Sequence, residues 1–446
     1  MGAPMKLESP RHGLPRHARP GWSISTLASM TMLIATVIAL LDLARRQSFS
    51  WPRQETPSSP SLGALRFQPD GTFQISIFED LHFGENAWDS WGPQQDVESV
   101  KVLDAILDAE ATIDLVVLNG DLITGDNTFR ENSTFYVDQI VSPLVKRGLT
   151  WASTYGNHDS AYNLSRADLL AREQTWPGAR TQSMVSGDVG ATNYYLPVYD
   201  ADCEDSGGDG CTPALLLWFF DSRGGFRYQK TDASTGELVG QPDWVDKRVV
   251  EWFQQTNAEL VEQAGRAIPA LAFVHIPTNA SLAFQGVGVD KHRQPGIDDD
   301  RPVAQQGQGW CADGRNDGSC EYGGQDVAFM AAVASTPGLL AVFSGHDHGN
   351  TWCYKWDRQL PGMSIAGTGV NLCFGQHSGY GGYGNWIRGA RQVVASVQKL
   401  AGSVVDTYVR LESGDVVGAV CLNATFGKDR YPATKNDKTR CRACKY

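Results

Sequence analysis

The chain has 446 residues, of which 41% are hydrophobic and 20% charged, a composition typical of globular proteins with a sizeable apolar core. Its formal net charge of -12 argues against nucleic acid as a main partner, because the phosphate backbone requires a basic surface. We therefore expect a folded protein that does not bind nucleic acid.

The first 66 residues predict a cytosolic tail, a transmembrane helix and a linker. Residues 1–20 are basic, and the segment 21–43 has no charge before residue 42, about the length that crosses a bilayer. The excess of lysine and arginine before this segment favours a type II signal anchor, with the rest of the chain in the secretory lumen or outside the cell. A cleaved signal peptide, which would give a secreted protein, is the alternative. Residues 44–66 are rich in serine and proline, as linkers are.

Sequons and cysteines, all downstream of this segment, are consistent with export. Four Asn-x-Ser/Thr sequons predict a glycoprotein, with acceptors at Asn132, Asn163, Asn279 and Asn423. Three pairs of cysteines have the spacing of loop-closing disulfides: Cys203 with Cys211, Cys311 with Cys320, and Cys353 with Cys373. The total of nine cysteines leaves at least one without a partner in its own chain.

From residue 67 onward, strand-like and helix-like patterns alternate, which predicts one α/β domain over residues 67–446. Apolar runs predict strands at 73–78, 113–121, 150–154, 214–220, 269–277 and 339–348. Helical spacing of apolar residues predicts helices at 96–110, 136–148, 244–260 and 326–335, the first with Asp96 as its N-cap. Two β runs joined by Ser-Gly-Asp predict a hairpin at 403–422.

Aspartates, histidines and one asparagine stand where these predicted strands end. They are Asp80, His82, Asp121, Asn157, His158, Asp159, His275, His346 and His348. Any one of them alone would be an ordinary turn or core residue. Random placement of 47 glycines and nine histidines would, however, give Gly-His-x-His only about 0.02 times, and here the other clusters accompany it in order. Because ligand sites of open α/β sheets lie beyond the carboxyl ends of strands, we expect one common site.

These residue types suit a pair of divalent cations. Aspartate and histidine bind iron, zinc and manganese, and a neutral amide oxygen adds a ligand without charge. One bridging carboxylate can hold two cations roughly 4 Å apart. Such a pair lowers the pKa of a bound water, which gives a hydroxide near neutral pH, and stabilises an in-line displacement. The sequence therefore predicts two divalent metal ions, either Fe, Zn or Mn.

The ordered motifs resemble those of the calcineurin-like metallophosphoesterase superfamily. They are Asp80-x-His82, Gly120-Asp121, Gly156-Asn157-His158-Asp159, His275 and Gly345-His346-x-His348. The stretch LCFGQHSGYGGYGNWIRGARQV at residues 372–393 is similar to fungal and plant members related to the purple acid phosphatases. This resemblance implies a four-layer α/β/β/α sandwich with a dinuclear centre at the strand ends.

The resemblance also implies a role for each residue. One metal ion would bind Asp80, His82 and His348, the other would bind Asn157, His275 and His346, and Asp121 would bridge the two. His158 would be the general acid that protonates the leaving alkoxide, and Asp159 would orient it. Purple acid phosphatases carry a tyrosine where this chain has Thr124 and lack a histidine at the position of His82. We therefore expect no Tyr–Fe(III) colour.

These features predict hydrolysis of phosphomonoesters by a metal-bound hydroxide, the substrate being a small molecule or a phosphoprotein. A phosphodiesterase with the same centre is the first alternative, although diesterases of the sphingomyelinase kind often have a histidine where this chain has Gly125. A catalytically silent scaffold protein of the secretory pathway is the second. The glycine- and tyrosine-rich residues 378–384 and His377 form either a substrate-facing loop or a tight structural one. We expect a monomer.

Overall fold

The computed structural model describes residues 62–203, 211–307 and 322–439, all of which belong to one compact unit, Pro60–Tyr446. The predicted tail and membrane anchor, most of the linker, and Cys311 and Cys320 lie outside the described residues, so the predictions made for them stay predictions. Within the described ranges, no helix is both long enough and apolar enough to span a bilayer.

A seven-stranded sheet has the strand order β1-β5-β6-β9-β10-β12-β11. Its strands are β1 (Leu65–Arg66), β5 (Tyr194–Tyr199), β6 (Leu215–Phe220), β9 (Ala270–Val274), β10 (Leu339–Ser344), β11 (Cys353–Trp356) and β12 (Val370–Phe374). Strands β6, β9, β10 and β12 pair in parallel, so their carboxyl ends meet at one edge of the sheet.

A six-stranded sheet has the order β15-β14-β13-β2-β3-β4. Its strands are β2 (Thr72–Phe78), β3 (Leu115–Asn119), β4 (Trp151–Thr154), β13 (Gly389–Ser396), β14 (Val405–Leu411) and β15 (Val416–Leu422). Strands β2, β3 and β4 are parallel, whereas β13 pairs antiparallel to β2 and brings the predicted C-terminal hairpin, β14 and β15, into the same sheet.

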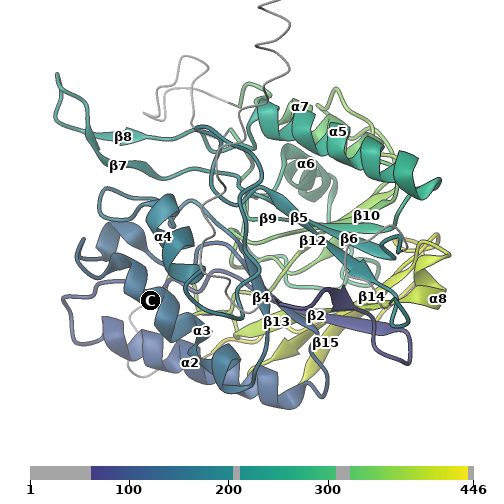
Figure 1. Ribbon diagram of the computed structural model, residues 1–446, viewed down its shortest axis with the longest axis horizontal. Coiled ribbons are helices and arrows are strands. Elements are labelled where there is room, and N and C mark those ends of the chain that lie inside the picture. The colour runs from purple at the N-terminus through teal and green to yellow at the C-terminus, as the bar shows by residue number, and fades with distance from the viewer. Residues whose placement is uncertain (1–61, 204–210, 308–321, 440–446) are drawn as a thin grey trace, which may run out of the picture. The chain divides into compact units, whose positions relative to one another are not determined.

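Helices cover the outer face of each sheet (Figure 1). The six-stranded sheet packs against α2 (Gly92–Ala109), α3 (Tyr136–Lys146) and α4 (Arg166–Glu173). The seven-stranded sheet packs against α5 (Lys247–Ala264), α6 (Asn279–Val287) and α7 (Val327–Ser335). A short helix, α8 (Val397–Leu400), follows β13, and the hairpin of β7 (Phe226–Thr231) and β8 (Leu238–Gly240) forms a separate ribbon.

Three apolar cores separate these layers. The central core lies between the sheets and contains Ile75 of β2 and Phe273 of β9. One outer core joins Phe220 of β6 to Phe253 of α5, and the other joins Val116 of β3 to the helices α2 and α3. Alternate residues of the strands face opposite cores, because successive side chains of a strand point to opposite faces. The layers follow the α/β/β/α order that the family resemblance implied.

The structure corrects the predicted start of the helix at residues 96–110. Helix α2 begins at Gly92, so the expectation that Asp96 is its N-cap is wrong. Asp96 is instead buried inside the helix, and its carboxylate accepts a hydrogen bond of 3.1 Å from the backbone N–H of Gly84.

The predicted disulfides Cys203–Cys211 and Cys353–Cys373 are present, and the second joins the paired strands β11 and β12. Cys421 is the free cysteine among the described residues.

Candidate metal centre

The candidate site lies where the parallel strands of both sheets end. Asp80 and His82 follow β2, Asp121 follows β3, and His346 follows β10, and all four have positive φ angles, of 53°, 49°, 48° and 73°. A left-handed backbone costs a non-glycine residue roughly 1–2 kcal/mol, and such strain concentrates at functional sites. The sharp turns that it produces aim these side chains back toward one another.

One group of possible metal ligands consists of Asp80, His82 and His348. Their ligand atoms all lie within 4.8 Å of one another, and all three residues are buried. The Nε2 atoms of His82 and His348 are 3.2 Å apart, and Nε2 of His348 is 3.5 Å from Oδ1 of Asp80. Two imidazole nitrogens and a carboxylate that converge in a buried place suit a divalent cation.

A second group consists of Asp121, His275 and His346, again with ligand atoms within 4.8 Å. The amide oxygen of Asn157 is buried and accepts no hydrogen bond from any described residue, which leaves it available as a ligand. Oδ2 of Asp121 is 2.9 Å from Nε2 of His275 and 3.8 Å from Nε2 of His82. The same carboxylate oxygen thus faces both groups, the placement that a bridging ligand needs. The donor set fits a pair of divalent ions.

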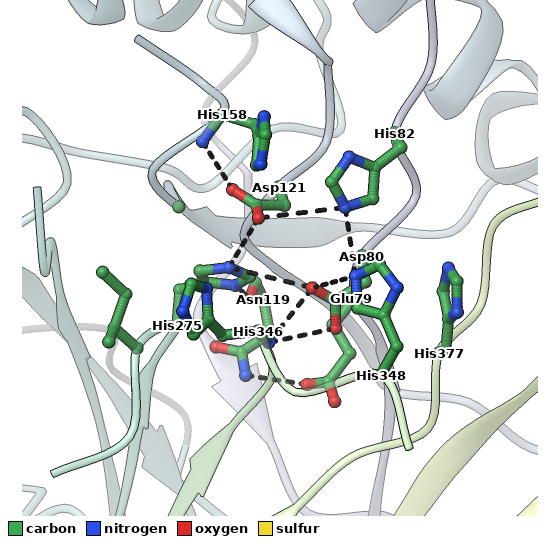
Figure 2. Close-up of polar contacts among 12 residues, drawn as sticks. Glu79, Asp80, His82, Asn119, Asp121, His158, His275, His346, His348 and His377 are labelled. Atoms are coloured by element: carbon green, nitrogen blue, oxygen red, sulfur yellow. Dashed lines mark hydrogen bonds and ion pairs between the residues drawn. The ribbon is translucent and has the colours of Figure 1, made fainter. Parts of the chain in front are cut away.

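The second nitrogen of three imidazole rings is held by a neighbour. Nδ1 of His82 is 3.0 Å from the hydroxyl of Thr124, Nδ1 of His275 is 2.9 Å from the carbonyl oxygen of Asn119, and Nδ1 of His348 is 2.8 Å from that of Tyr383. Figure 2 shows the three rings turned toward the carboxylates of the site. Such partners fix the ring and leave Nε2 free to bind a metal.

The protonation states of three candidate ligands favour metal binding, whereas Asp121 and Asp80 outweigh burial and raise the pKa of a fourth, His275, to about 10. Burial and the neighbouring histidines lower the pKa of His82 to about 3, and burial with His275 lowers that of His346 to about 4. Burial opposes ionisation of Asp121, but His275 and His158 outweigh it and hold its pKa well below the ordinary value. Neutral imidazole and ionised carboxylate are the forms that bind metal ions.

His158 lies at the mouth of the site, with 38% of its side chain exposed. Its backbone N–H donates to Oδ1 of Asp121 at 2.7 Å, and its Nδ1 is 3.4 Å from Oδ1 of Asp126. Burial alone would lower the pKa of His158. The carboxylates of Asp121 and Asp126 outweigh burial and raise the pKa from its ordinary value of 6.5 to about 9. Both carboxylates thus favour the imidazolium, the form that a general acid requires.

The expectation that Asp159 orients His158 is wrong. Its Oδ1 accepts hydrogen bonds of 2.9 Å from the backbone N–H groups of Leu122 and Ile123, and its Oδ2 accepts one of 2.8 Å from that of Gly156. Asp159 thus fixes the loop that carries Asp121. The carboxylate beside the imidazole belongs to Asp126, and no motif in the sequence singles it out.

A cavity of about 330 Å³ opens onto this centre. His82, His158 and His346 line it together with Tyr383 and Gly382 of the glycine- and tyrosine-rich loop, so this loop forms part of the cavity wall. The ring of Tyr383 stacks on that of His348 with centroids 4.0 Å apart. His377 also packs on His348, with centroids 3.8 Å apart.

Comparison with known proteins assigns the chain to a family. Residues 77–350 match the calcineurin-like phosphoesterase family, and the chain belongs to that family. It is 25% identical over 399 residues to "Probable inactive purple acid phosphatase 28" of Arabidopsis thaliana, covering 84% of this chain and 88% of the relative. It is 24% identical over 329 residues to "Phosphatase DCR2" of Saccharomyces cerevisiae, covering 70% of this chain and 49% of the relative. A dimetal phosphatase structure from Danio rerio is 12% identical with a TM-score of 0.44, covering 79% of this chain and 98% of that one.

Proposed function

We propose that the protein hydrolyses phosphate esters at a two-metal centre. The observation that carries the proposal is the convergence of two groups of candidate ligands on one carboxylate, Asp121, with His158 on the same cavity. Divalent ions bound as a pair supply an activated water and neutralise charge on the phosphoryl oxygens. The two groups of candidate ligands would hold these ions, and no other donor set among the described residues gathers three such side chains.

His158 supplies the second requirement, a proton for the departing oxygen. It stands beside the ligand groups and lines the same cavity, where its ring can reach an ester oxygen of a bound substrate. Asp126 keeps the ring charged from one side, and the hydrogen bond from the His158 backbone to Asp121 fixes its distance from the ligands. General acid catalysis of this kind contributes roughly 10²- to 10⁴-fold.

The sequence favours phosphomonoesters, and we retain them as the first candidate substrates. One observation favours phosphodiesters as the second candidate: His346 lines the cavity that holds His158 and also a separate cavity on the side of Asn157. Two cavities that meet at one ligand offer room for two substituents on phosphorus.

A silent scaffold is the remaining alternative, since three curated relatives are named as probable inactive purple acid phosphatases. Against it, all seven predicted ligand positions of this chain carry metal-binding side chains. Asp80, Asp121 and His275 are almost completely buried. Burying an ionised group is costly. The ion pair with His275 at 2.9 Å offsets this cost for Asp121, and bound metal ions would offset the remaining carboxylate charge.

The test is initial-rate hydrolysis of 4-nitrophenyl phosphate and bis(4-nitrophenyl) phosphate by the full-length chain. The protein is first treated with a chelator, and Mn(II), Zn(II) or Fe(II) is then added. We expect metal-dependent turnover that Asp121→Asn abolishes, whereas Asp415→Asn, on an exposed turn, retains it. The ratio of the two rates decides between the monoester and the diester. A folded wild-type chain that hydrolyses neither ester with any of these metals contradicts the proposal.

A further inference from the structure

A second cavity, of about 220 Å³, adjoins the candidate metal centre. Asn157 and His346 are among its described lining residues, and His158 is not. The cavity is therefore contiguous with the ligands of one metal ion but lies away from the general acid. A group bound there would be attached to phosphorus without being the group that leaves.

Two glycines bring the cavity wall against the ligand Asn157. Gly224 and Gly225 follow β6 with φ angles of 89° and 70°. A Cβ on Gly224 would lie 2.7 Å from Cβ of Asn157, and one on Gly225 would lie 2.2 Å from the carbonyl oxygen of Asn157. Only glycine permits this approach, so the wall and the ligand form one surface.

The wall of this cavity presents hydrogen-bond acceptors that have no donor. Gln305 is only 7% exposed, and its Oε1 accepts no hydrogen bond from the described residues. Asp243, on the same cavity, is half-buried, and its Oδ1 atom is buried and accepts no hydrogen bond from the described residues. Buried acceptors without partners are rare in folded proteins because they lose their hydration without compensation.

The charges of the residues that line this cavity limit the kinds of ligand that could bind there. No lysine or arginine lies among the described residues of this cavity, and Asp243 is its one carboxylate. Arg223, the nearest arginine in sequence, is bound to Asp246 and to the carbonyl oxygen of Trp244. The described lining therefore offers no cationic side chain to an anionic group, whereas hydroxyl or ammonium donors would satisfy both oxygens.

We propose that this cavity is a substrate subsite for the retained alcohol of a phosphodiester, and that it selects alcohols bearing hydroxyl or ammonium groups. Oε1 of Gln305 and Oδ1 of Asp243 accept hydrogen bonds from the retained arm, while His158 faces the departing one. This inference rests on the proposed phosphoesterase function in its diester form.

The test compares 4-nitrophenyl phosphodiesters that share a leaving group and differ in the retained arm: ethyl, glyceryl or 2-aminoethyl. We expect wild-type kcat/KM to favour the glyceryl or the aminoethyl arm over ethyl by about tenfold, the effect of one or two added hydrogen bonds. Gln305→Leu and Asp243→Asn should each reduce that preference at least threefold. Gln255→Leu, the same substitution on the exposed face of α5, should leave the preference unchanged.

The relative effects of the two arms identify the donor, since preference for aminoethyl alone assigns an ammonium and preference for glyceryl assigns hydroxyls. Equal rates for all three arms in the wild type would overturn the inference, as would variants that slow all three substrates equally. Calorimetric binding of the matching non-hydrolysable phosphonates, in the presence of Mn(II), separates the two proposals. Selective binding without turnover would uphold the subsite while contradicting the proposed catalysis, and unselective binding would contradict the subsite.

Discussion

At the scale of single residues, the candidate site needs glycines that let neighbouring segments approach closely, as well as side chains that can bind metal ions. A Cβ on Gly156 would lie 2.2 Å from Oδ1 of Asp121, and one on Gly120 would lie 2.5 Å from the ring of His275. The glycines that precede the ligands therefore leave space for the neighbouring ligand side chains. The same two positions explain why the motifs read Gly-Asp and Gly-Asn-His-Asp.

The role proposed for His158 predicts a dependence on the leaving group. His158→Asn should lower kcat for an alkyl phosphate by roughly 10²- to 10³-fold, because an alkoxide departs only with a proton. For 4-nitrophenyl phosphate, whose phenolate departs unprotonated, the loss should be about tenfold or less. Steady-state rates on the two substrates measure the difference. Equal losses on both would show that His158 positions the substrate and does not donate a proton.

At the scale of elements, helix α2 is tied to the loop after β2 by a buried carboxylate. Asp96 is 4% exposed and accepts hydrogen bonds from the backbone N–H of Gly84, at 3.1 Å to one oxygen and 3.3 Å to the other. Burial raises the pKa of Asp96 from its ordinary value of 3.8 to about 7, although the Gly84 hydrogen bonds oppose the change. The helix thus holds the loop that carries His82 through a group whose charge depends on pH.

This shift predicts how stability changes with pH. Because the folded pKa of Asp96 lies above the unfolded one, the folded state binds the proton more tightly, and the resulting stability is lost as pH rises through about 7. Asp96→Asn removes this dependence while keeping an acceptor for Gly84. Between pH 5 and pH 8 we expect the wild type to lose on the order of 2–3 kcal/mol relative to the variant. Urea unfolding of both proteins at the two pH values measures it, and parallel losses would contradict the assignment.

At the scale of the whole domain, one buried arginine connects the two sheets. Arg391 of β13 is 1% exposed. Its guanidinium donates hydrogen bonds of 2.6 Å to the carbonyl oxygens of Phe374 in β12 and Thr351, and one of 3.1 Å to the hydroxyl of Thr407 in β14. Burial lowers its pKa to about 10, and it remains charged at neutral pH. The six-stranded sheet is thereby joined to the seven-stranded sheet near their common strand ends.

Removing this connection should destabilise the whole domain. Arg391→Met leaves two buried carbonyl oxygens without donors, and we expect a loss of roughly 2–5 kcal/mol in the free energy of unfolding. Arg266→Met, at an exposed arginine, should change it by about 0.5 kcal/mol or less. Denaturant unfolding followed by circular dichroism makes the comparison. Similar values for the two variants would show that Arg391 does not hold the sheets together.

The sequence predicts the strands that have continuous apolar runs, but it does not predict a strand such as β13, in which polar residues interrupt the apolar pattern. β3, β6, β9 and β10 are buried along their whole or nearly whole length, so their sequences are almost uniformly apolar. β13 contains Arg391 and Gln392, both buried and both hydrogen-bonded, and no apolar period marks it as a central strand. Its place beside β2 follows from pairing across more than 300 residues, which one sequence does not encode locally.

The sequence by itself determined the types of the candidate ligands, their order and their position at strand ends, because strand pattern, glycine turns and metal-binding chemistry are properties of a few neighbouring residues. Only the tertiary structure decided which groups meet. It placed His82 against His348, Asp126 beside His158, and Asp159 on the loop of Asp121. These contacts join residues up to 266 positions apart, and packing of the two sheets rather than any local signal brings them together.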